Sequence, residues 1–305
     1  MTRPVLLLCP RVIYNSCMPS RDRALILLGL CTLLSGAAVF AQQPPPSSAG
    51  ARILLLPRRI VSGERATLAV LDVNGRLTPG VTVNFSNGDR VTTDQTGRGL
   101  FVAPLNPGVI FGSIAGRQGR VATTIFASTD PAVTAVEVKT VPRIASLSDR
   151  FDILGSGFCG DADTNAVTIG GEAAIVLAAS PTALVVLPPL GLEPGVAPVQ
   201  ITCGKNSLPT FSMIFLGLEL HADTSPLAPG EHRRLTVSVA GIKSKISLEA
   251  KNLAPDVAEL LGGDSVRHAS SGGAENVVRF EVVGRRRGSF LISIRLVPIP
   301  ARPVQ

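Results

Sequence analysis

The chain has 305 residues, of which 45% are hydrophobic, so it is long enough for two or three domains with packed cores. Only 4% of the residues are aromatic, none of them tryptophan. The formal net charge is +7, but residues after position 41 carry 25 basic and 21 acidic side chains, a net charge of only +4. Such a small excess excludes nucleic acid as a predicted partner, and no pattern in the chain predicts a cofactor.

Residues 1–41 have the layout of a secretory signal peptide. A basic stretch leads into an apolar run over residues 24–34, and small residues precede Ala41, after which we expect cleavage. Met18 is an alternative start of translation. The apolar run is shorter than the roughly 20 residues that span a bilayer, so no integral membrane segment is expected after cleavage. An uncleaved anchor is the alternative, and the predicted location is secreted, periplasmic or on the cell surface.

A Pro/Ser-rich linker at residues 42–51 leads into a first unit at residues 52–128. Apolar and polar residues alternate here with a period of two, as at Val81, Val83 and Phe85, and turn dipeptides recur at short intervals. Because the spacing is that of short strands, it predicts a β-sandwich.

Within this unit, the stretch VTVNFSNGDRVTTDQTGRGLFVAP resembles the bacterial immunoglobulin-like repeats of adhesins such as invasin. The matching residues are Thr93, Asp94 and Gly97, between two alternating segments. The resemblance implies a sandwich that acts as a spacer or interaction module. Asp94 and Gly97 are expected to form a hairpin turn.

Residues 130–216 carry a second ordered set of motifs: PRI from Pro142, GSGF from Gly155, VTIGG from Val167, and two further strand segments. This order resembles an IPT/TIG domain, an immunoglobulin-like family found in cell-surface receptors and in many bacterial exported proteins. The resemblance implies a small β-sandwich with an interaction or spacer role, and it brings no catalytic residues.

The GSGF motif begins a glycine pattern that also fits a nucleotide-binding loop. Gly155, Gly157 and Gly160 have the G-x-G-x-x-G spacing, which needs a helix after it so that the helix N–H groups face a pyrophosphate. The sequence instead predicts a turn and then a strand at Val167–Ile169. A nucleotide site is therefore not expected.

The residues after Gly160 have the spacing of calcium ligands. The candidates Asp161, Asp163, Asn165 and Glu172 occupy positions 1, 3, 5 and 12 of an EF-hand-like loop. Position six is alanine rather than glycine, and no helices are predicted to flank the loop. We therefore favour a solvated acidic turn without metal and keep a calcium-dependent module as an alternative.

Two cysteines lie outside the leader, Cys159 and Cys203, and an even count in an exported chain favours a disulfide. In an immunoglobulin-like sandwich the loop that holds Cys159 and the end of the VQITC strand lie at the same end. The resemblance therefore implies that these two cysteines are bonded. Closing a loop of this length should stabilise the fold by about 4 kcal/mol.

Residues 217–305 predict a third all-β, sandwich-like unit with a Pro-rich tail. Arg285, Arg286 and Arg287 fall between two predicted strands, as a solvated turn or as a binding site for an anionic polysaccharide, a lipid headgroup or an acidic partner. The unit also contains all three histidines of the chain, at positions 221, 232 and 268, without metal-binding or triad spacing. No enzymatic activity is predicted.

The predicted fold class is therefore all-β, with tandem immunoglobulin-like sandwiches after a cleaved signal peptide. The leading hypothesis is an exported, non-catalytic modular protein that acts in adhesion, spacing or contact with a protein or another cell-surface component. An accessory polysaccharide-binding protein is the alternative from another class. The chain after the leader has neither tryptophan nor tyrosine to stack on sugars, and most phenylalanines are expected in the cores.

Overall fold

The computed structural model describes residues 52–130, 138–223, 225–272 and 276–297, with two short strands outside them, β1 (Asn15–Ser16) and β26 (Arg302–Pro303). Apart from β1, the predicted signal peptide and the linker lie outside the described residues. The described chain is all-β except for one 3-10 turn, η1 (Ala162–Thr164), which confirms the predicted all-β class. No helix in the described ranges has the length and hydropathy to cross a bilayer.

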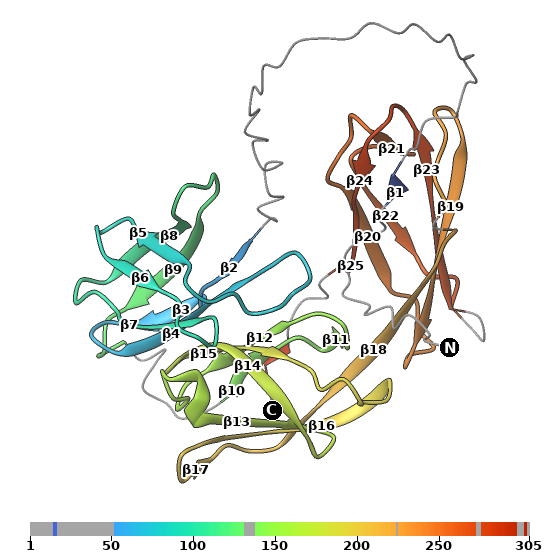
Figure 1. Ribbon diagram of the computed structural model, residues 1–305. Helices are drawn as coiled ribbons and strands as arrows, with labels where there is room; N and C mark the ends of the chain where they lie inside the picture. Colours follow the sequence, from blue (N-terminus) through green and yellow to red (C-terminus); the bar gives the residue numbers. More distant parts are fainter. Residues whose placement is uncertain are drawn as a thin grey trace, which may run out of the picture.

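The strands form three packed units, which follow one another along the chain in Figure 1. The first contains β2 (Ile53–Leu55), β3 (Arg59–Val61), β4 (Arg65–Leu71), β5 (Thr82–Phe85), β6 (Arg90–Thr92), β7 (Arg98–Val102), β8 (Gly108–Ile114) and β9 (Val121–Phe126). The second contains β10 (Val138–Val141), β11 (Ile144–Ser146), β12 (Phe151–Gly155), η1, β13 (Asn165–Ile169), β14 (Glu172–Ser180), β15 (Ala183–Leu187), β16 (Gly195–Cys203), β17 (Asn206–Ser207) and the first part of β18 (Phe211–His221). The third contains the rest of β18, β19 (His232–Ala240), β20 (Ser247–Asn252), β21 (Ala258–Leu260), β22 (Ser265–Ala269), β23 (Val277–Gly284), β24 (Ser289–Phe290) and β25 (Ile292–Leu296).

The first unit is a sandwich of two layers. One layer has the strand order β3-β9-β8-β5-β6, and the other consists of β2, β4 and β7. The alternation of residues predicts that Val83 and Phe85 face the core. Both side chains are buried between the layers beside Leu68, which confirms it. Burying one such side chain stabilises the fold by about 1.5–3 kcal/mol.

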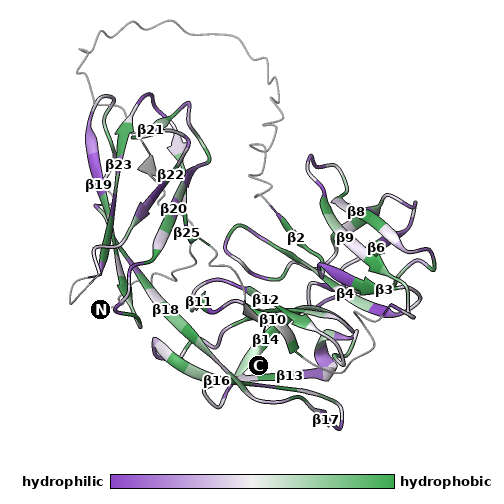
Figure 2. Cartoon of the chain, turned by 180° about the vertical axis from the view of Figure 1, so that it is seen from behind, coloured by the Kyte–Doolittle hydropathy of each residue, from purple (hydrophilic) through white to green (hydrophobic). Residues whose placement is uncertain are grey.

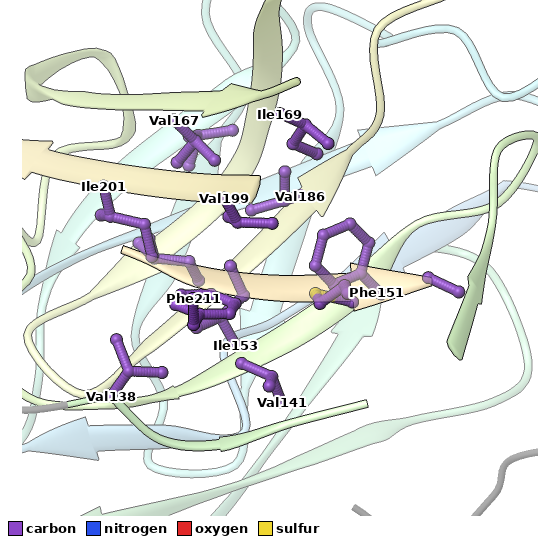
Figure 3. Close-up of a cluster of buried hydrophobic side chains, with 14 of the residues drawn as sticks. Val138, Val141, Phe151, Ile153, Val167, Ile169, Val186, Val199, Ile201 and Phe211 are labelled. Carbon is purple, nitrogen blue, oxygen red and sulfur yellow. The ribbon is translucent and has the colours of Figure 1, made fainter. Parts of the chain in front are cut away.

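The second unit is a sandwich whose layers share β14. The first residues of β14 pair with β13, and its later residues pair with β15. The register of the β14–β15 pair shifts between Val176 and Ala178. The core between the layers is drawn in Figure 3, where side chains such as Ile153, Val186 and Ile201 converge from different strands. Phe151 meets Phe215 edge to face in this core, with ring centroids 5.9 Å apart.

The third unit packs a layer of β18, β19, β23 and β21 against a layer of β22, β20 and β25. Figure 2 shows the hydrophobic character of β23 beside the hydrophilic start of β19. In β19 Leu235, Val237 and Val239 are buried in the core, and the other residues are more exposed except Arg233, whose side chain is also buried.

Strand β18 belongs to both the second and the third unit. Residues 211–215 pair with β16, and residues 217–221 pair with β19. Because alternate side chains of a strand point to opposite faces, Phe215 lies in the core of the second unit and Leu216 in the core of the third. The predicted boundary between residues 216 and 217 therefore falls inside a continuous strand.

Candidate functional site

The loop of the GSGF motif is closed by the Cys159–Cys203 disulfide, whose Cα atoms lie 5.5 Å apart. Asn165 stands opposite Cys203 in the β13–β16 pair and holds the same loop. Its side-chain carbonyl accepts the Cys159 N–H at 2.9 Å, and its NH₂ group donates to the Cys159 carbonyl at 2.9 Å. Phe158 is buried in the core of the second unit. The disulfide, the Asn165 hydrogen bonds and the buried Phe158 side chain therefore fix the conformation of the loop.

The four candidate calcium ligands do not converge. The Asp161 carboxylate accepts the N–H of Asp163, the Asp163 carboxylate pairs with Arg98, and Asn165 is engaged with Cys159. Glu172 begins β14 beyond the far end of β13, which is roughly 13 Å long. The described residues contain no group of three acidic, histidine or cysteine side chains placed to hold a metal.

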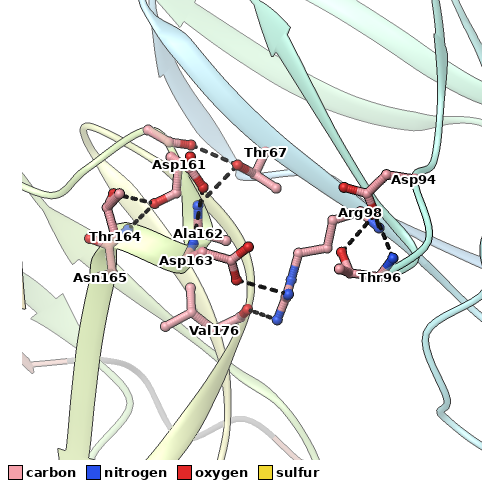
Figure 4. A network of polar contacts seen from close by, with 11 residues as sticks. Thr67, Asp94, Thr96, Arg98, Asp161, Ala162, Asp163, Thr164, Asn165 and Val176 are labelled. Carbon is pink, nitrogen blue, oxygen red and sulfur yellow. Dashed lines mark hydrogen bonds and ion pairs between the residues drawn. The ribbon is translucent and has the colours of Figure 1, made fainter.

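The loop instead contacts the first unit through the polar network of Figure 4. The Thr67 hydroxyl donates to the Gly160 carbonyl at 2.8 Å and accepts the Ala162 N–H at 3.1 Å. Arg98 donates to the Asp163 carboxylate at 3.0 Å and to the Val176 carbonyl at 2.8 Å. Residues far apart in the chain therefore meet in one inter-unit contact.

The turn that the sequence predicts around Asp94 and Gly97 positions the Arg98 backbone at this contact. Asp94 accepts hydrogen bonds from the Thr96 hydroxyl at 2.7 Å and from the Thr96 and Arg98 N–H groups. The Thr96 hydroxyl bond, with these N–H bonds, lowers the pKa of Asp94 below its usual value. Gly97 has φ of +77° and packs against Leu77 and Thr78, so the turn requires glycine.

An apolar cluster, which we call the junction core, lies beside this network. It joins Leu55, Ala69 and Leu71 of the first unit to Leu177, Ala178 and Val185 of the second. The layers also continue into one another, because Thr67 of β4 pairs with Ala179 of β14.

An ion pair between Arg58 and Asp152 also crosses this junction, at 2.6 Å. Burial raises the pKa of Asp152 although Arg58 and Arg150 oppose the rise. A partly exposed pair of this kind adds little to the stability of the junction.

The triple arginine lies between β23 and β24, and two of its members have acidic partners. Arg285 pairs with Glu259 at 2.8 Å, and Arg286 pairs with Asp256 at 3.1 Å. Arg287 is exposed. Neighbouring carboxylates thus neutralise much of the positive charge of the arginines that the sequence analysis considered as an anion-binding site.

Glu249 is the best-paired carboxylate of the third unit. It lies on β20 between Arg267 of β22 and Arg295 of β25, which face it directly across the sheet. Its side chain is 8% exposed and accepts bonds from Arg295 at 2.7 Å, Arg267 at 3.1 Å and the Ser265 hydroxyl at 3.0 Å. These bonds, with that from Arg295 the strongest, lower the pKa of Glu249 to about 2.

We expect Glu249 to make the third unit acid-sensitive. Its folded pKa of about 2 is lower than the ordinary value of 4.5, so its contribution is complete above pH 4.5 and is lost as the pH falls towards 2. Glu249→Gln should cost about 2 kcal/mol at pH 7, and the difference from the native chain should shrink below pH 4. Urea unfolding across this pH range measures it, with the exposed Glu193→Gln as control. An equal loss at all pH values would contradict the assignment.

The three histidines have separate partners. His232 lies 2.7 Å from a Glu281 oxygen, His221 lies 3.7 Å from Glu219, and His268 packs against the Phe280 ring. On the paired strands β18 and β19, His221 stands opposite Thr236, four residues or roughly 13 Å along the strand from His232. His268 lies on β22 in the other layer, so the three are not brought together.

A further feature, which the sequence did not predict, lies on the outer face of the β3-β9-β8-β5-β6 layer. A shallow pocket of about 510 Å³ opens there, lined by Phe85, Ser86, Phe111, Ser113, Gly119 and Arg120. The Arg120 guanidinium carbon lies 4.2 Å from the centre of the Phe111 ring. A second pair repeats the arrangement on the same layer, with Arg59 5.7 Å from the centre of the Phe126 ring.

Most phenylalanines are buried in the cores, as the sequence predicts, but Phe111 and Phe126 face outward. The phase of the apolar–polar alternation along each strand could have identified both residues as outward-facing. In β8, Ile110 and Ile114 face inward, so Phe111 must face outward, and in β9 the inward Ile125 places Phe126 outward.

No protein-family model and no curated protein sequence matches the chain, so the IPT/TIG resemblance stays a prediction. Solved structures give distant likenesses. The Bacteroides ovatus mixed-linkage glucan utilization locus SGBP-B, in complex with a mixed-linkage heptasaccharide, is 12% identical over 78% of this chain and 73% of that chain, with a TM-score of 0.29. The BSP domain of a biofilm associated protein is 14% identical over 53% and 29%, with a TM-score of 0.25. Domains 1–6 of the surface layer protein SbsC are 14% identical over 81% and 38%, with a TM-score of 0.18. These TM-scores are too low to transfer a function to this chain.

Proposed function

We propose that this chain is an exported, non-catalytic bacterial protein that acts as a rigid spacer and protein-contact module outside the cytoplasm. The observation that carries the proposal is the construction of its two junctions, in which packed side chains and paired strands join each unit to the next. A rigid array of three units keeps the first and the third unit at a fixed separation, which is the property that a spacer needs.

The junction of the second and third units depends on β18. Bending there would break the pairing of β18 with β16 or with β19, or would withdraw Phe215 or Leu216 from its core. Removing one such side chain from a core costs about 2–5 kcal/mol. This cost supports a fixed angle between the two units.

The junction of the first and second units depends on the junction core and on the network around Thr67 and Arg98. Each hydrogen bond contributes about 1 kcal/mol, and the buried apolar cluster contributes more. Together they favour the docked arrangement over free rotation.

The location outside the cytoplasm rests on the Cys159–Cys203 disulfide, because such bonds persist in oxidising compartments. The predicted signal peptide and the resemblances to IPT/TIG domains and invasin-type repeats agree with it. The calcium-dependent alternative lacks support, since Asp163 and Asn165 serve the junction and the loop.

Distance measurements between spin labels test the rigidity. Labels at Asn87→Cys and Lys243→Cys, exposed positions in the first and third units, should give one narrow distance distribution by electron–electron double resonance. A pair within the first unit, Asn87→Cys with Arg76→Cys, sets the width due to the labels alone. A much broader distribution between the outer units than within one unit would overturn the proposal.

A further inference from the structure

We propose that the outer face of the β3-β9-β8-β5-β6 layer binds a carboxylate-bearing polysaccharide, with Arg120 as the main anion-binding residue. This site goes beyond the spacer function and does not depend on the rigidity of the array. In Figure 1, β5 and β8 lie on the side of the first unit that points away from the second unit, so the junction does not cover them. At the other edge of the layer, β3 borders the junction, because the Arg59 carbonyl accepts a hydrogen bond from the Ser180 hydroxyl.

The first argument concerns the state of Arg120. Its guanidinium lies over the Phe111 ring, which holds the group in place, and it forms no ion pair within the described part of the chain. A guanidinium is planar and presents paired N–H groups that match the two oxygens of a carboxylate. A cation that is held over an aromatic ring but has no carboxylate partner among the described residues can bind an external anion.

The second argument is charge. Residues 52–128 carry nine basic and four acidic side chains. Arg59 and Arg90 also occupy outward positions on this layer, and none of the outward positions on its five strands is acidic. The strands of the layer therefore attract anions, and the Asp89 carboxylate in the β5–β6 turn accepts a hydrogen bond from the Asn87 side chain at 2.6 Å.

The third argument is the remaining hydrogen-bonding capacity of the pocket. The Ser86 hydroxyl oxygen accepts the Phe111 N–H at 3.1 Å, which leaves its own O–H free to donate. The Ser113 hydroxyl donates to the Asn84 carbonyl at 3.3 Å, which leaves its oxygen free to accept. One donor and one acceptor beside a fixed cation suit a sugar that carries hydroxyls and a carboxylate.

The repetition of the arginine–phenylalanine pair favours a polymer. Phe111 faces Ala122 across the β8–β9 pair, and Phe126 lies four residues further along β9, which is roughly 13 Å. Between the pairs the outward side chains include Thr124 and, opposite it on β8, Val109, a single exposed apolar side chain rather than an apolar cluster. A lipid surface would call for apolar residues that insert, and a protein partner would call for buried apolar anchors, so a regularly charged polysaccharide fits better.

Isothermal titration with polygalacturonate, a carboxylated polysaccharide, tests the inference on the full exported chain with its disulfide intact. We expect saturable binding that weakens as NaCl rises, because salt screens exposed charges. Arg120→Ala should raise the dissociation constant about tenfold, and Arg120→Lys should restore only part of the loss. Arg76→Ala removes an equal charge from an exposed loop of the same unit and should change binding less than about twofold. Unchanged melting temperatures would show that the variants fold.

Three further probes separate this ligand from its competitors. Neutral dextran, poly-glutamate of matched charge and vesicles with anionic lipid should all bind more weakly than polygalacturonate. Dextran binding of equal strength would overturn the role of the carboxylate, and equal poly-glutamate binding would overturn the role of the sugar. Preferential binding to vesicles, no binding to polygalacturonate, or binding that Arg120→Ala leaves unchanged would each overturn the inference.

Discussion

Alanine in place of Gly160 is expected to force the first and second units apart. A Cβ atom at this position would lie 1.9 Å from the Arg65 carbonyl oxygen and 2.6 Å from its carbon, which is backbone and cannot turn aside. To relieve this clash, the loop must move away from Arg65, which stretches the hydrogen bonds of the Thr67 hydroxyl to Gly160 and Ala162. We expect a loss of about 3 kcal/mol in the free energy of unfolding, from overpacking and weakened hydrogen bonds.

Urea unfolding measures this loss, and the spin-label pair across the units should show a broader distribution in the same variant. Gly191→Ala is the matched control, because that glycine also lacks a left-handed conformation and its added Cβ would meet only the mobile end of Glu172, at 3.2 Å. Equal stability of the two variants would show that Gly160 does not set the distance between the units.

Replacing both Cys159 and Cys203 with serine is expected to cost about 4 kcal/mol, because the bond closes a loop with a sequence separation of 44 and limits the unfolded chain. The loop that it holds also carries Gly160 and η1. The double variant should therefore unfold earlier in urea and show a weaker contact between the first and second units.

Reduction of the native chain with dithiothreitol is the control, since it should reproduce the loss without changing the sequence. Added reductant should have no effect on the double variant. A loss under about 1 kcal/mol in both experiments would mean that the loop is held mainly by Asn165 and Phe158.

The strands of this protein could be predicted because their signal is local. In β5 and β19, alternate residues are apolar, and the apolar ones are buried in the structure. The same signal also places Phe111 outside the core, because the phase of the strand decides which face a phenylalanine takes. Ile110 and Ile114 had already specified the inward face.

The glycine pattern in ILGSGFCGD shows the limit of reading a motif alone. The strand predicted after it argued correctly against a nucleotide loop, as β13 follows the turn. Nothing local indicated that Gly160 would face the Arg65 carbonyl, or that Asp163 would meet Arg98, because these partners lie in another unit.

By itself, the sequence determined the all-β class and most of the alternating core positions, because strand period and turn residues act over a few neighbouring positions. Only the tertiary structure decided that β18 serves two cores, that the first unit docks on the GSGF loop, and that two arginine–phenylalanine pairs share one outer face. Each of these depends on contacts between residues distant in the chain, whose geometry is set by the packing of whole layers and leaves no periodic trace in the sequence.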